Sequence, residues 1–527
     1  MARRPEGGAD FLQLSAASAP ARGLTTWLAD ALRAGICDGR LPEGVSLPAT
    51  RVLADDLGVS RGVIVEAYQR LREEGLVGAR RGAGTRVLPL TPRHQQPDPS
   101  PAAPADRPRT PADTPAPPRL PRRWRGQAET DLSPGVPDLS AFPRAAWLRA
   151  ERAVLAQANA ADLGYDDPRG NAWLRKELAG WLSRTRGLRT SPEDIIIVTG
   201  VAQALALLAQ GLRERATTGI AVEDPGSRGA RDELIHWGLD PVPIPVDDQG
   251  LQVGDLVCSG LRAALLTPAH QFPTGVVLAP QRRRDLLAWA ASGGLVIEDD
   301  YDAEYRYDRA PVPALQASAP DRVAYAGSTS KTLAPGMRLG WLVPPRRMHA
   351  QLVTAKHASD LGSPALPQLV LAHLIAGGEL ERHVRLVRKR LRNRRDALLD
   401  ALREHLPRAC VQGVPAGLHL LITFPDLADE VDDADLANRI HQAGVLVHPL
   451  SWHRQRPGPP GLVLGYAAHP PDQLREAAQL IAHAVQMSRT GPVTNTRVLP
   501  TSAPRVPERR GVPGDGRAVC PDRDRLR

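Results

Sequence analysis

Lys331 stands among hydroxyl side chains, in the run Ser328-Thr329-Ser330-Lys331-Thr332, and Arg338 follows soon after it. Arginine supplies nearly all of the basic side chains, because the sequence has only four lysines: Lys176, Lys331, Lys356 and Lys389. An amine can lose its proton and form a Schiff base with an aldehyde, whereas a guanidinium cannot. Hydroxyls and a guanidinium nearby can hold a phosphate. The run therefore predicts a cofactor with both groups, which pyridoxal 5'-phosphate (PLP) fits; the alternative is an ordinary exposed lysine in a Ser/Thr loop.

The length and composition restrict the class of protein. A chain of 527 residues is too long for one ordinary domain. No apolar run approaches the roughly 18 residues that a membrane span needs, and Met1–Gly8 has arginines without an apolar segment behind them. The cysteines are too far apart for a zinc or redox motif: Cys37, Cys258, Cys410 and Cys520. We expect a reduced, cytoplasmic protein with no membrane partner and no metal. The net charge of +9 permits nucleic-acid binding without proving it.

Two stretches have a composition that opposes folding. Thr91 to Pro121 is dominated by Pro, Ala, Asp and Arg, and the tail from Arg489 to Arg527 is again rich in Pro, Gly and Arg. Such segments cannot bury enough apolar surface to fold. The sequence therefore predicts a first domain over 20–88, a Pro-rich linker over 89–130, a second domain over 131–487 and a disordered tail over 488–527.

The second domain alternates short apolar runs with longer amphipathic segments. Asp194–Val198, Arg262–Thr267 and Leu295–Asp299 are typical of buried parallel strands, and the segments between them are typical of crossover helices. This alternation predicts an α/β fold whose functional residues lie at the carboxyl ends of the strands.

The first domain begins with amphipathic helical segments over Leu24–Arg40, Ala49–Leu57 and Gly62–Glu74. Gly58 supplies a turn, and Ser60 is a plausible N-cap for the helix that follows. This spacing is typical of a helix-turn-helix, in which the second helix begins beside base edges and phosphates. Any three-helix bundle has a similar spacing, so the alternative is a bundle with no role in DNA binding.

A basic hairpin follows these helices. The run Arg80-Arg81-Gly82-Ala83-Gly84-Thr85-Arg86-Val87 places glycines at a tip that arginines flank. A basic wing at this distance from the helices favours a winged helix over a plain bundle.

Residues Leu24–Val87 resemble the winged-helix DNA-binding domain of GntR-type bacterial regulators. The matching runs are Leu47-Pro48-Ala49-Thr50-Arg51, Val59-Ser60-Arg61, Glu66-Ala67-Tyr68-Gln69-Arg70-Leu71, Glu74-Gly75-Leu76 and Gly82-Ala83-Gly84-Thr85. Arg51 and Arg61 fall where the family places its main DNA-contacting arginines. The resemblance implies a double-stranded DNA operator as partner and these DNA-binding residues: Arg51, Ser60, Arg61, Arg70, Arg81, Gly82 and Thr85. Gly62 departs from the pattern, in which a polar residue such as Thr is common.

Residues from about Asp131 to Met487 resemble a fold-type I aminotransferase. A winged helix, a linker and an aminotransferase-like domain in this order resemble a MocR-type regulator. The resemblance implies a multidomain chain, with an N-terminal winged helix-turn-helix and an α/β PLP-dependent transferase-like domain. It also implies PLP as the cofactor and a homodimer with shared sites.

Around the cofactor ring, the resemblance assigns several residues. Asp299 matches the carboxylate that pairs with the pyridine nitrogen and keeps the ring an electron sink. Tyr301 matches the phenol near the 3-hydroxyl, and His270-Gln271-Phe272-Pro273-Thr274-Gly275 resembles the turn beside the ring. Lys331 matches the Schiff-base lysine. Alone, Asp299 could equally cap a helix and Gly275 could be a turn glycine.

Around the phosphate, the matching residues are Ser328, Ser330, Arg338 and the loop Gly200-Val201-Ala202 at a predicted helix N-terminus. Tyr165 resembles the tyrosine that reaches the phosphate of the neighbouring subunit. The alternatives are that Tyr165 only packs at an interface and that Gly200 is a turn glycine without a ligand.

Two positions depart from the catalytic pattern. Val463, in Gly461-Leu462-Val463-Leu464-Gly465, replaces the arginine that grips the substrate α-carboxylate in aminotransferases. Losing such a pair costs about 2–5 kcal/mol of ligand binding. Ser227 stands where an aromatic side chain usually stacks on the ring. Arg228 or Arg231 is the alternative source of a carboxylate partner.

The segment Glu379–Arg403 is heavily basic. A solvated helix face is the preferred interpretation, and an extension of the DNA-binding surface is the alternative.

These features together predict a PLP-responsive transcriptional regulator whose second domain serves as sensor and dimerisation platform. The effector is PLP, an amine or an amino acid, and the loss at Val463 favours PLP itself. The main alternative is a PLP-dependent aminotransferase or related enzyme with an attached DNA-binding domain. A further alternative is a DNA-binding dimer in which the large domain binds no cofactor.

Overall fold

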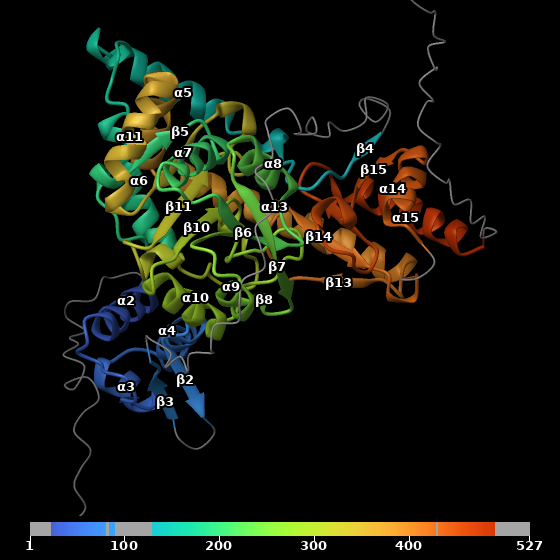
Figure 1. The fold of residues 1–527 in the computed structure, drawn as a ribbon, viewed down its shortest axis with the longest axis horizontal. Helices are drawn as coiled ribbons and strands as arrows, with labels where there is room; N and C mark the ends of the chain where they lie inside the picture. The colour runs from blue at the N-terminus through green and yellow to red at the C-terminus, as the bar shows by residue number, and fades with distance from the viewer. Residues whose placement is uncertain (1–22, 81–83, 90–128, 428–430, 491–527) are drawn as a thin grey trace, which may run out of the picture. The chain divides into compact units, whose positions relative to one another are not determined.

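The computed structural model describes residues 23–80, 84–89, 129–427 and 431–490 (Figure 1). The predicted linker and tail lie almost wholly outside these residues, so they and the domain boundaries remain predictions. Within the described ranges, no helix is long and apolar enough to cross a membrane.

The N-terminal elements form a three-stranded sheet next to a group of helices. They are α2 (Leu24–Cys37), β1 (Ser46–Leu47), α3 (Thr50–Leu57), α4 (Arg61–Glu73), β2 (Val77–Arg80) and β3 (Gly84–Val87). Leu53, Ile64 and Leu71 are fully buried in their common core. Gly58 ends α3 in the left-handed conformation, with φ of 63°, which a side chain would oppose. This turn fixes the angle at which α4 leaves α3.

Strands β2 and β3 pair antiparallel, with Val77 opposite Val87, and β3 also pairs with β1. The hairpin has the position and strand order expected of a wing. Its tip, which includes Arg81 and Gly82, lies outside the described residues.

The larger part of the chain contains an eight-stranded sheet with the order β5-β12-β11-β10-β9-β6-β7-β8. The strands are β5 (Ile196–Val198), β6 (Gly219–Asp224), β7 (Asp240–Asp247), β8 (Gly250–Leu251), β9 (Ala263–Leu266), β10 (Leu295–Asp300), β11 (Val323–Ser328) and β12 (Gly340–Val343). Two of the runs predicted as parallel strands, β9 and β10, are parallel neighbours. The third run forms β5, which pairs antiparallel with β12; because β12 is also antiparallel to β11, β5 runs in the same direction as β9, β10 and β11.

Helices cover both faces of this sheet. They are α5 (Arg144–Gln157), α6 (Ala172–Arg186), α7 (Val201–Arg213), α8 (Arg228–His236), α9 (Val253–Cys258), α10 (Pro280–Ala291), α11 (Arg346–Asp360), α12 (Ala365–Ala376) and α13 (Glu379–His405). Side chains alternate between the faces along each strand. On β6, Val222 joins the core cluster with α7 and α11, whereas Ala221 joins the cluster with α10. The burial on both faces explains why the strands are apolar runs rather than alternating ones.

A second sheet has the order β13-β14-β17-β16 and is antiparallel, and β15 pairs separately with β4. The strands of this sheet are β13 (Cys410–Gln412), β14 (His419–Thr423), β16 (His448–Pro449) and β17 (Gly461–Gly465). The separate pair consists of β4 (Thr130–Asp131) and β15 (Val445–Leu446), and the helices of this region are α14 (Asp433–Gln442) and α15 (Pro471–Thr490). The β4–β15 pair joins the first residues after the predicted linker to this C-terminal region.

The basic helix α13 is only partly solvated. Arg388 donates to the carbonyl of Glu304 at 2.6 Å, and Arg394, which is 6% exposed, pairs with Asp138 at 2.9 Å. For these arginines the predicted solvated face was wrong, because the protein itself supplies their partners. Arg385 and Lys389 are exposed, as predicted.

Candidate cofactor site and DNA-binding surface

Asp299 and Asp300 end β10 and point to opposite faces of the sheet, as consecutive strand residues must. Asp300 is held through one oxygen: its Oδ2 lies 2.5 Å from Arg186 Nε, and the Tyr325 hydroxyl donates to the same oxygen at 2.6 Å, while its Oδ1 is buried without a partner among the described residues. The Asp299 Oδ1 is buried and has no hydrogen-bond partner among the described residues. Because Arg186 already pairs with Asp300, Asp299 is the more available carboxylate for a ligand at this strand end.

Burial, with the Asp300 carboxylate next, raises the pKa of Asp299 to about 7, and the Lys331 ammonium opposes this shift. A cationic N–H donor placed against Asp299 would stabilise its charged form. This suits a protonated ring nitrogen better than an apolar or anionic group.

Lys331 follows β11 and points toward the segment after β4. Its Nζ donates to the Gly135 carbonyl at 2.6 Å. Gly135 has φ of +83°, and a Cβ there would lie only 3.2 Å from Nζ, so a glycine leaves room for the amine. Burial lowers the pKa of Lys331, while Asp302 and Asp299 oppose that shift. A lowered pKa increases the fraction of neutral amine, which is the form that attacks an aldehyde.

Gly200 and Arg338 lie beside each other at the N-terminus of α7. Gly200 has φ of 97° and precedes the first helical residue, Val201, with Ala202 after it. The Arg338 guanidinium lies 3.1 Å from the position that a Gly200 Cβ would occupy, and it donates to the Thr199 carbonyl. A helix N-terminus with a guanidinium against it is a suitable site for a phosphate.

A glycine at position 340 allows the backbone of β12 to lie close to Gly200. In the antiparallel register Gly340 pairs with Val198, and a Cβ on Gly340 would lie 2.9 Å from the Gly200 Cα. Ser328 ends β11 with 7% exposure, and its hydroxyl accepts from the Ser330 amide at 3.3 Å. The predicted phosphate residues thus come from the neighbouring strands β5, β12 and β11.

Tyr301 follows Asp299 by two residues, and its hydroxyl lies 3.1 Å from His270 Nδ1. The same Nδ1 lies 2.9 Å from Asp302 Oδ2. Atoms of His270, Asp302 and His419 lie within 4.8 Å of one another, but His270 and Asp302 are hydrogen-bonded to each other and His419 Nε2 faces the Pro273 carbonyl at 3.2 Å. We interpret this group as a hydrogen-bond network.

Tyr165 stands apart from these residues. Its side chain is 93% exposed, so the single chain does not bury it in the site.

Val463 occupies the predicted arginine position in an apolar setting. It is fully buried, pairs with Leu421 on β14 and His448 on β16, and shares a small cluster with Leu450, against which Phe272 packs. The surroundings of Val463 therefore contain no room prepared for a guanidinium.

The alternative carboxylate partners are also committed elsewhere. Arg231 donates to the carbonyls of His453 at 2.9 Å and Trp452 at 3.2 Å, and Arg228 lies 3.8 Å from Asp232. Ser227 caps α8, because its hydroxyl accepts from the Ala230 amide at 3.3 Å. These contacts weaken the hypothesis that a nearby arginine replaces the one absent at Val463.

Replacing Val463 by arginine is expected to lower the free energy of unfolding by about 2 kcal/mol or more, because it buries a charge without a partner. It should not create tight binding of alanine. Chemical unfolding and alanine titration of V463R, with V463L as the control, test this expectation. Tight alanine binding by a stably folded V463R would show that the pocket is prepared for a carboxylate.

The predicted DNA-binding residues lie on the surface of the winged helix. Arg51 and Arg61 are exposed, and the only described hydrogen bond of Arg61 is a long one, 3.4 Å from Nε to the Thr50 hydroxyl. Ser60 is the N-cap residue of α4, but its hydroxyl makes no capping bond. Arg70 contacts Glu66 and Thr26, and Thr85 is half-buried on β3. Arg51, Ser60 and Arg61 are thus the residues with polar groups most free for DNA.

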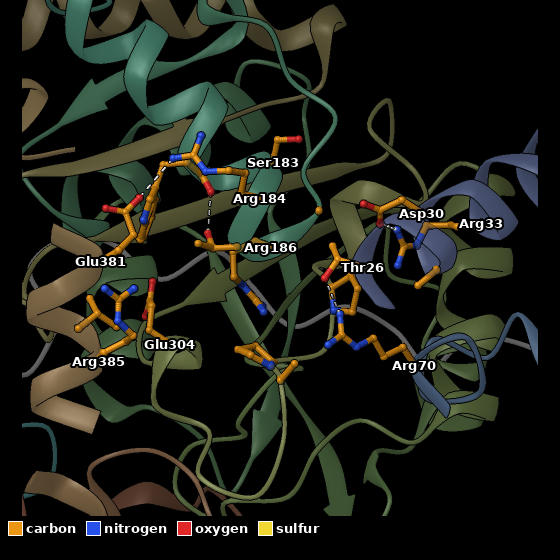
Figure 2. Close-up of a pocket in the computed structure, with 18 of the residues that line it drawn as sticks. Thr26, Asp30, Arg33, Arg70, Ser183, Arg184, Arg186, Glu304, Glu381 and Arg385 are labelled. Carbon is orange, nitrogen blue, oxygen red and sulfur yellow. Dashed lines mark hydrogen bonds and ion pairs between the residues drawn. The ribbon is translucent and has the colours of Figure 1, made fainter. Parts of the chain in front are cut away.

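A separate cavity of about 300 Å³ has none of the predicted cofactor residues in its lining, and Figure 2 shows the residues that form its walls. Its walls carry several arginines, but four of them already have acidic partners. The pairs are Arg33 with Asp30 and Glu74, Arg70 with Glu66, Arg184 with Glu381, and Arg186 with Asp300. The cavity therefore offers less free positive charge than its composition suggests.

Sequence reasoning missed several residues of the cofactor region. Gly135 holds Lys331, and Glu223 accepts from both the amide and the hydroxyl of Thr267. Burial raises the pKa of Glu223 to about 7. Glu223 was visible in the sequence as an acidic residue at a strand end, whereas Gly135 had no signal beyond being a glycine.

Comparison with known proteins matches both parts of the chain. Residues 129–481 match the family described as aminotransferase class I and II, and residues 24–87 match the bacterial regulatory proteins of the gntR family. The structure of Pyrococcus horikoshii kynurenine aminotransferase, determined in complex with PMP, aligns with a TM-score of 0.64 and 27% identity, over 70% of this chain and 94% of that one.

Two regulators are similar along nearly their whole length. The HTH-type pyridoxine biosynthesis transcriptional regulator PdxR of Corynebacterium glutamicum is 34% identical, over 88% of this chain and 96% of its own. The probable rhizopine catabolism regulatory protein MocR of Rhizobium meliloti is 31% identical, over 91% of this chain and 97% of its own.

The fold and the matches define a helix-turn-helix transcriptional regulator with an aminotransferase domain of class I and II. Within that class, the chain belongs to the MocR-type group of the GntR family, as its sequence predicted.

Proposed function

We propose that this regulator binds PLP covalently through Lys331 and that PLP is its effector. The observation that carries the proposal is that one site contains both a buried Asp299 oxygen without a hydrogen-bond partner and a partly buried lysine amine whose pKa is lowered. PLP would supply an aldehyde for the amine and an electron-accepting ring. Asp299 would hold the ring nitrogen, and Tyr301 would lie near the 3-oxygen.

The phosphate would lie at the N-terminus of α7. The amides of Gly200, Val201 and Ala202, the hydroxyls of Ser328 and Ser330, and Arg338 would hold it. The close approach of Gly340 to Gly200 supports this assignment, because it keeps the ends of β12 and β5 near enough for residues beside both strands to contact the same phosphate.

A homodimer would complete the site. Besides Tyr165, the side chains of Leu148, Leu155 and Leu163 are each more than half exposed, at 53%, 51% and 61%. Exposed apolar side chains of this size commonly mark an interface. We propose that Tyr165 of a second subunit reaches the phosphate and that the protein acts in the cytoplasm.

DNA binding would respond to PLP only if PLP prefers one arrangement of the two winged helices, since equal affinity shifts no population. The buried Val463 favours PLP over an amino acid as effector. The name of the Corynebacterium relative, a regulator of pyridoxine biosynthesis, points the same way. The alternative of an active aminotransferase is supported by the intact Lys331 and Asp299.

The test is a PLP titration followed by visible absorption, with affinity for a selected DNA duplex measured in the same samples. The wild type should develop a visible band that borohydride removes, and mass spectrometry should locate the reduced adduct on Lys331. Lys331→Ala should lose the band completely, and the exposed Lys389→Ala should keep it.

A change in DNA affinity that follows the band supports PLP as effector. A band without such a change would make PLP a fixed prosthetic group, and transamination of common amino acids at enzyme-like rates would favour the enzyme. Absence of the band in the wild type would overturn the assignment of the cofactor.

A further inference from the structure

Gln203 lies in the first turn of α7, beside the proposed phosphate site. Its side-chain oxygen accepts a hydrogen bond from the Thr199 amide at 2.9 Å and another from the Thr199 hydroxyl at 3.3 Å. A glutamine at this helix position that turns back to an amide before the helix resembles half of a capping box. The carbonyl of the same Thr199 accepts from the Arg338 guanidinium. Thr199 is therefore held between Gln203 and a predicted phosphate ligand, directly before the Gly200 turn.

The partners of the Gln203 amide determine its orientation. Its nitrogen donates to Asp360 Oδ2 at 2.8 Å. A backbone amide can only donate and a carboxylate can only accept, so a reversed Gln203 would lose its contacts with both Thr199 and Asp360. The side chain thus joins the start of α7 to the end of α11 in one defined way.

Asp360 is in turn fixed by a buried lysine. Lys356, four residues earlier on α11, is 0% exposed, and its Nζ lies 2.6 and 2.7 Å from the two oxygens of Asp360. The Gly362 amide donates to Oδ1 at 3.1 Å, so each oxygen of Asp360 accepts two hydrogen bonds. Burial favours the neutral form of Asp360, but the hydrogen bonds from Gln203 and Lys356 outweigh it and lower its pKa. The ammonium balances this charge, so the group adds little negative potential beside a phosphate.

The packing of α7 against α11 supports this group. Leu208 of α7 and Leu352 of α11 lie in the same buried core cluster. At Gly211 a Cβ would lie 3.1 Å from Leu352 Cδ2, so the two helices are close at that point. Core packing sets the separation of the helices there, and the contact between Gln203 and Asp360 fixes the end that faces the phosphate site.

We propose that Gln203 is a positioning residue for the phosphate of PLP, and that the Lys356–Asp360 ion pair fixes the orientation of Gln203. Gln203 holds the backbone of Thr199, which in turn places the Gly200 turn and the Arg338 guanidinium. It acts through these groups and is not itself a ligand of the phosphate. This inference rests on the proposed function, since it assumes that PLP occupies the site.

The experiment compares the dissociation constants of PLP and of pyridoxal, which has the same ring and aldehyde but no phosphate. Both constants come from the visible band of the full-length protein, and the ratio of the pyridoxal constant to the PLP constant measures recognition of the phosphate. Q203M keeps the length of the side chain, adds no charge and removes both hydrogen-bonding groups. It should weaken PLP binding by about tenfold, as expected for hydrogen bonds that support a charged ligand, and leave the pyridoxal constant unchanged. A role in folding alone would weaken both alike.

Gln351 is the matched control, because it joins the same two helices at their other end. Its side-chain nitrogen donates to the Gly211 carbonyl at 3.4 Å and to Glu214. Gly211 lies about 12 Å further along α7 than Gln203. Q351M should therefore keep the wild-type ratio of the two constants.

A charge-neutral double variant tests the ion pair. K356M/D360L removes both charges together, so the net charge stays constant while Gln203 loses its anchor. It should lower the ratio in the same direction as Q203M, and its combination with Q203M should cause little further fall, because the groups act in one chain. An unchanged ratio in K356M/D360L would overturn the role of the ion pair.

The outcomes separate this inference from the proposed function. An unchanged ratio in Q203M, equal losses for PLP and pyridoxal, or an equal fall of the ratio in Q351M would overturn the positioning role and leave the cofactor assignment intact. Should Q203M fail to fold, Q203A replaces it, and the same ratio decides. A wild type without a PLP-dependent band, or a Lys331→Ala variant with an unchanged band, would overturn both.

Discussion

Replacing Arg186 by methionine is expected to lower the free energy of unfolding by about 3–5 kcal/mol, because it leaves the Asp300 charge buried without its partner. The side chains of Arg186 and Asp300 are 0% and 2% exposed, and their ion pair measures 2.5 Å. Arg186 also donates to the Val312 carbonyl at 2.5 Å. The loss should appear as a lower denaturation midpoint in urea, followed by circular dichroism.

Arg184 provides a matched control on the same helix. Its side chain is 62% exposed and pairs with Glu381 at 3.2 Å. An exposed pair of this kind contributes about 0–1 kcal/mol, so R184M should change the midpoint little. The double variant R186M/D300N should recover part of the loss, since it removes the unpaired charge. Equal stabilities of R186M and R184M would show that water or another group compensates Asp300.

The local features of the fold were predictable because they depend on neighbouring residues. Gly58 and Ser60 indicate the turn and the start of α4, and Gly200 indicates the N-terminus of α7. The apolar run of β10, with Asp299 near its carboxyl end, likewise indicated a buried strand that leads into a site.

The reversed strand β12, which separates β5 from the other parallel strands, could not be predicted in the same way. A fully buried strand is apolar on both faces whether its neighbour is parallel or antiparallel. β12 returns from the Lys331 segment to lie between β5 and β11, antiparallel to both. Nothing within Asp194–Val198 encodes that return.

Contacts between distant residues form the rest of the site. Gly135 and Lys331 are 196 positions apart, and Arg186 and Asp300 are 114 positions apart. Periodicity and capping describe only one helix or strand at a time. They therefore cannot reveal contacts between residues that are distant in the sequence, which become apparent only in the folded structure. The same limit applies to α13, in which Arg394 has the sequence appearance of a surface residue but pairs with Asp138.

Replacing Arg61 by alanine is expected to weaken binding to a specific duplex by about 10–100-fold, corresponding to about 1–3 kcal/mol for a lost base contact. Arg61 is exposed at the first position of α4, where a recognition helix meets DNA. Its only described internal bond is the 3.4 Å contact with Thr50, so thermal stability should stay close to that of the wild type. The duplex would be one selected by the wild-type protein from random sequences, and fluorescence anisotropy would give the affinity.

Arg40 is the matched control, because its side chain is 54% exposed and pairs with Asp38 outside α3 and α4. R40A removes the same charge, so it should change affinity far less than R61A if Arg61 makes a direct contact. The salt dependence distinguishes the kind of contact. If Arg61 contacts a phosphate, R61A should weaken binding to all duplexes alike and reduce the slope of log affinity against log salt concentration by about one. If Arg61 contacts a base, R61A should instead reduce the selectivity for one base pair of the duplex. Equal affinities of R61A and R40A would contradict the assignment of Arg61, and would transfer the recognition role to Arg51 or to the wing.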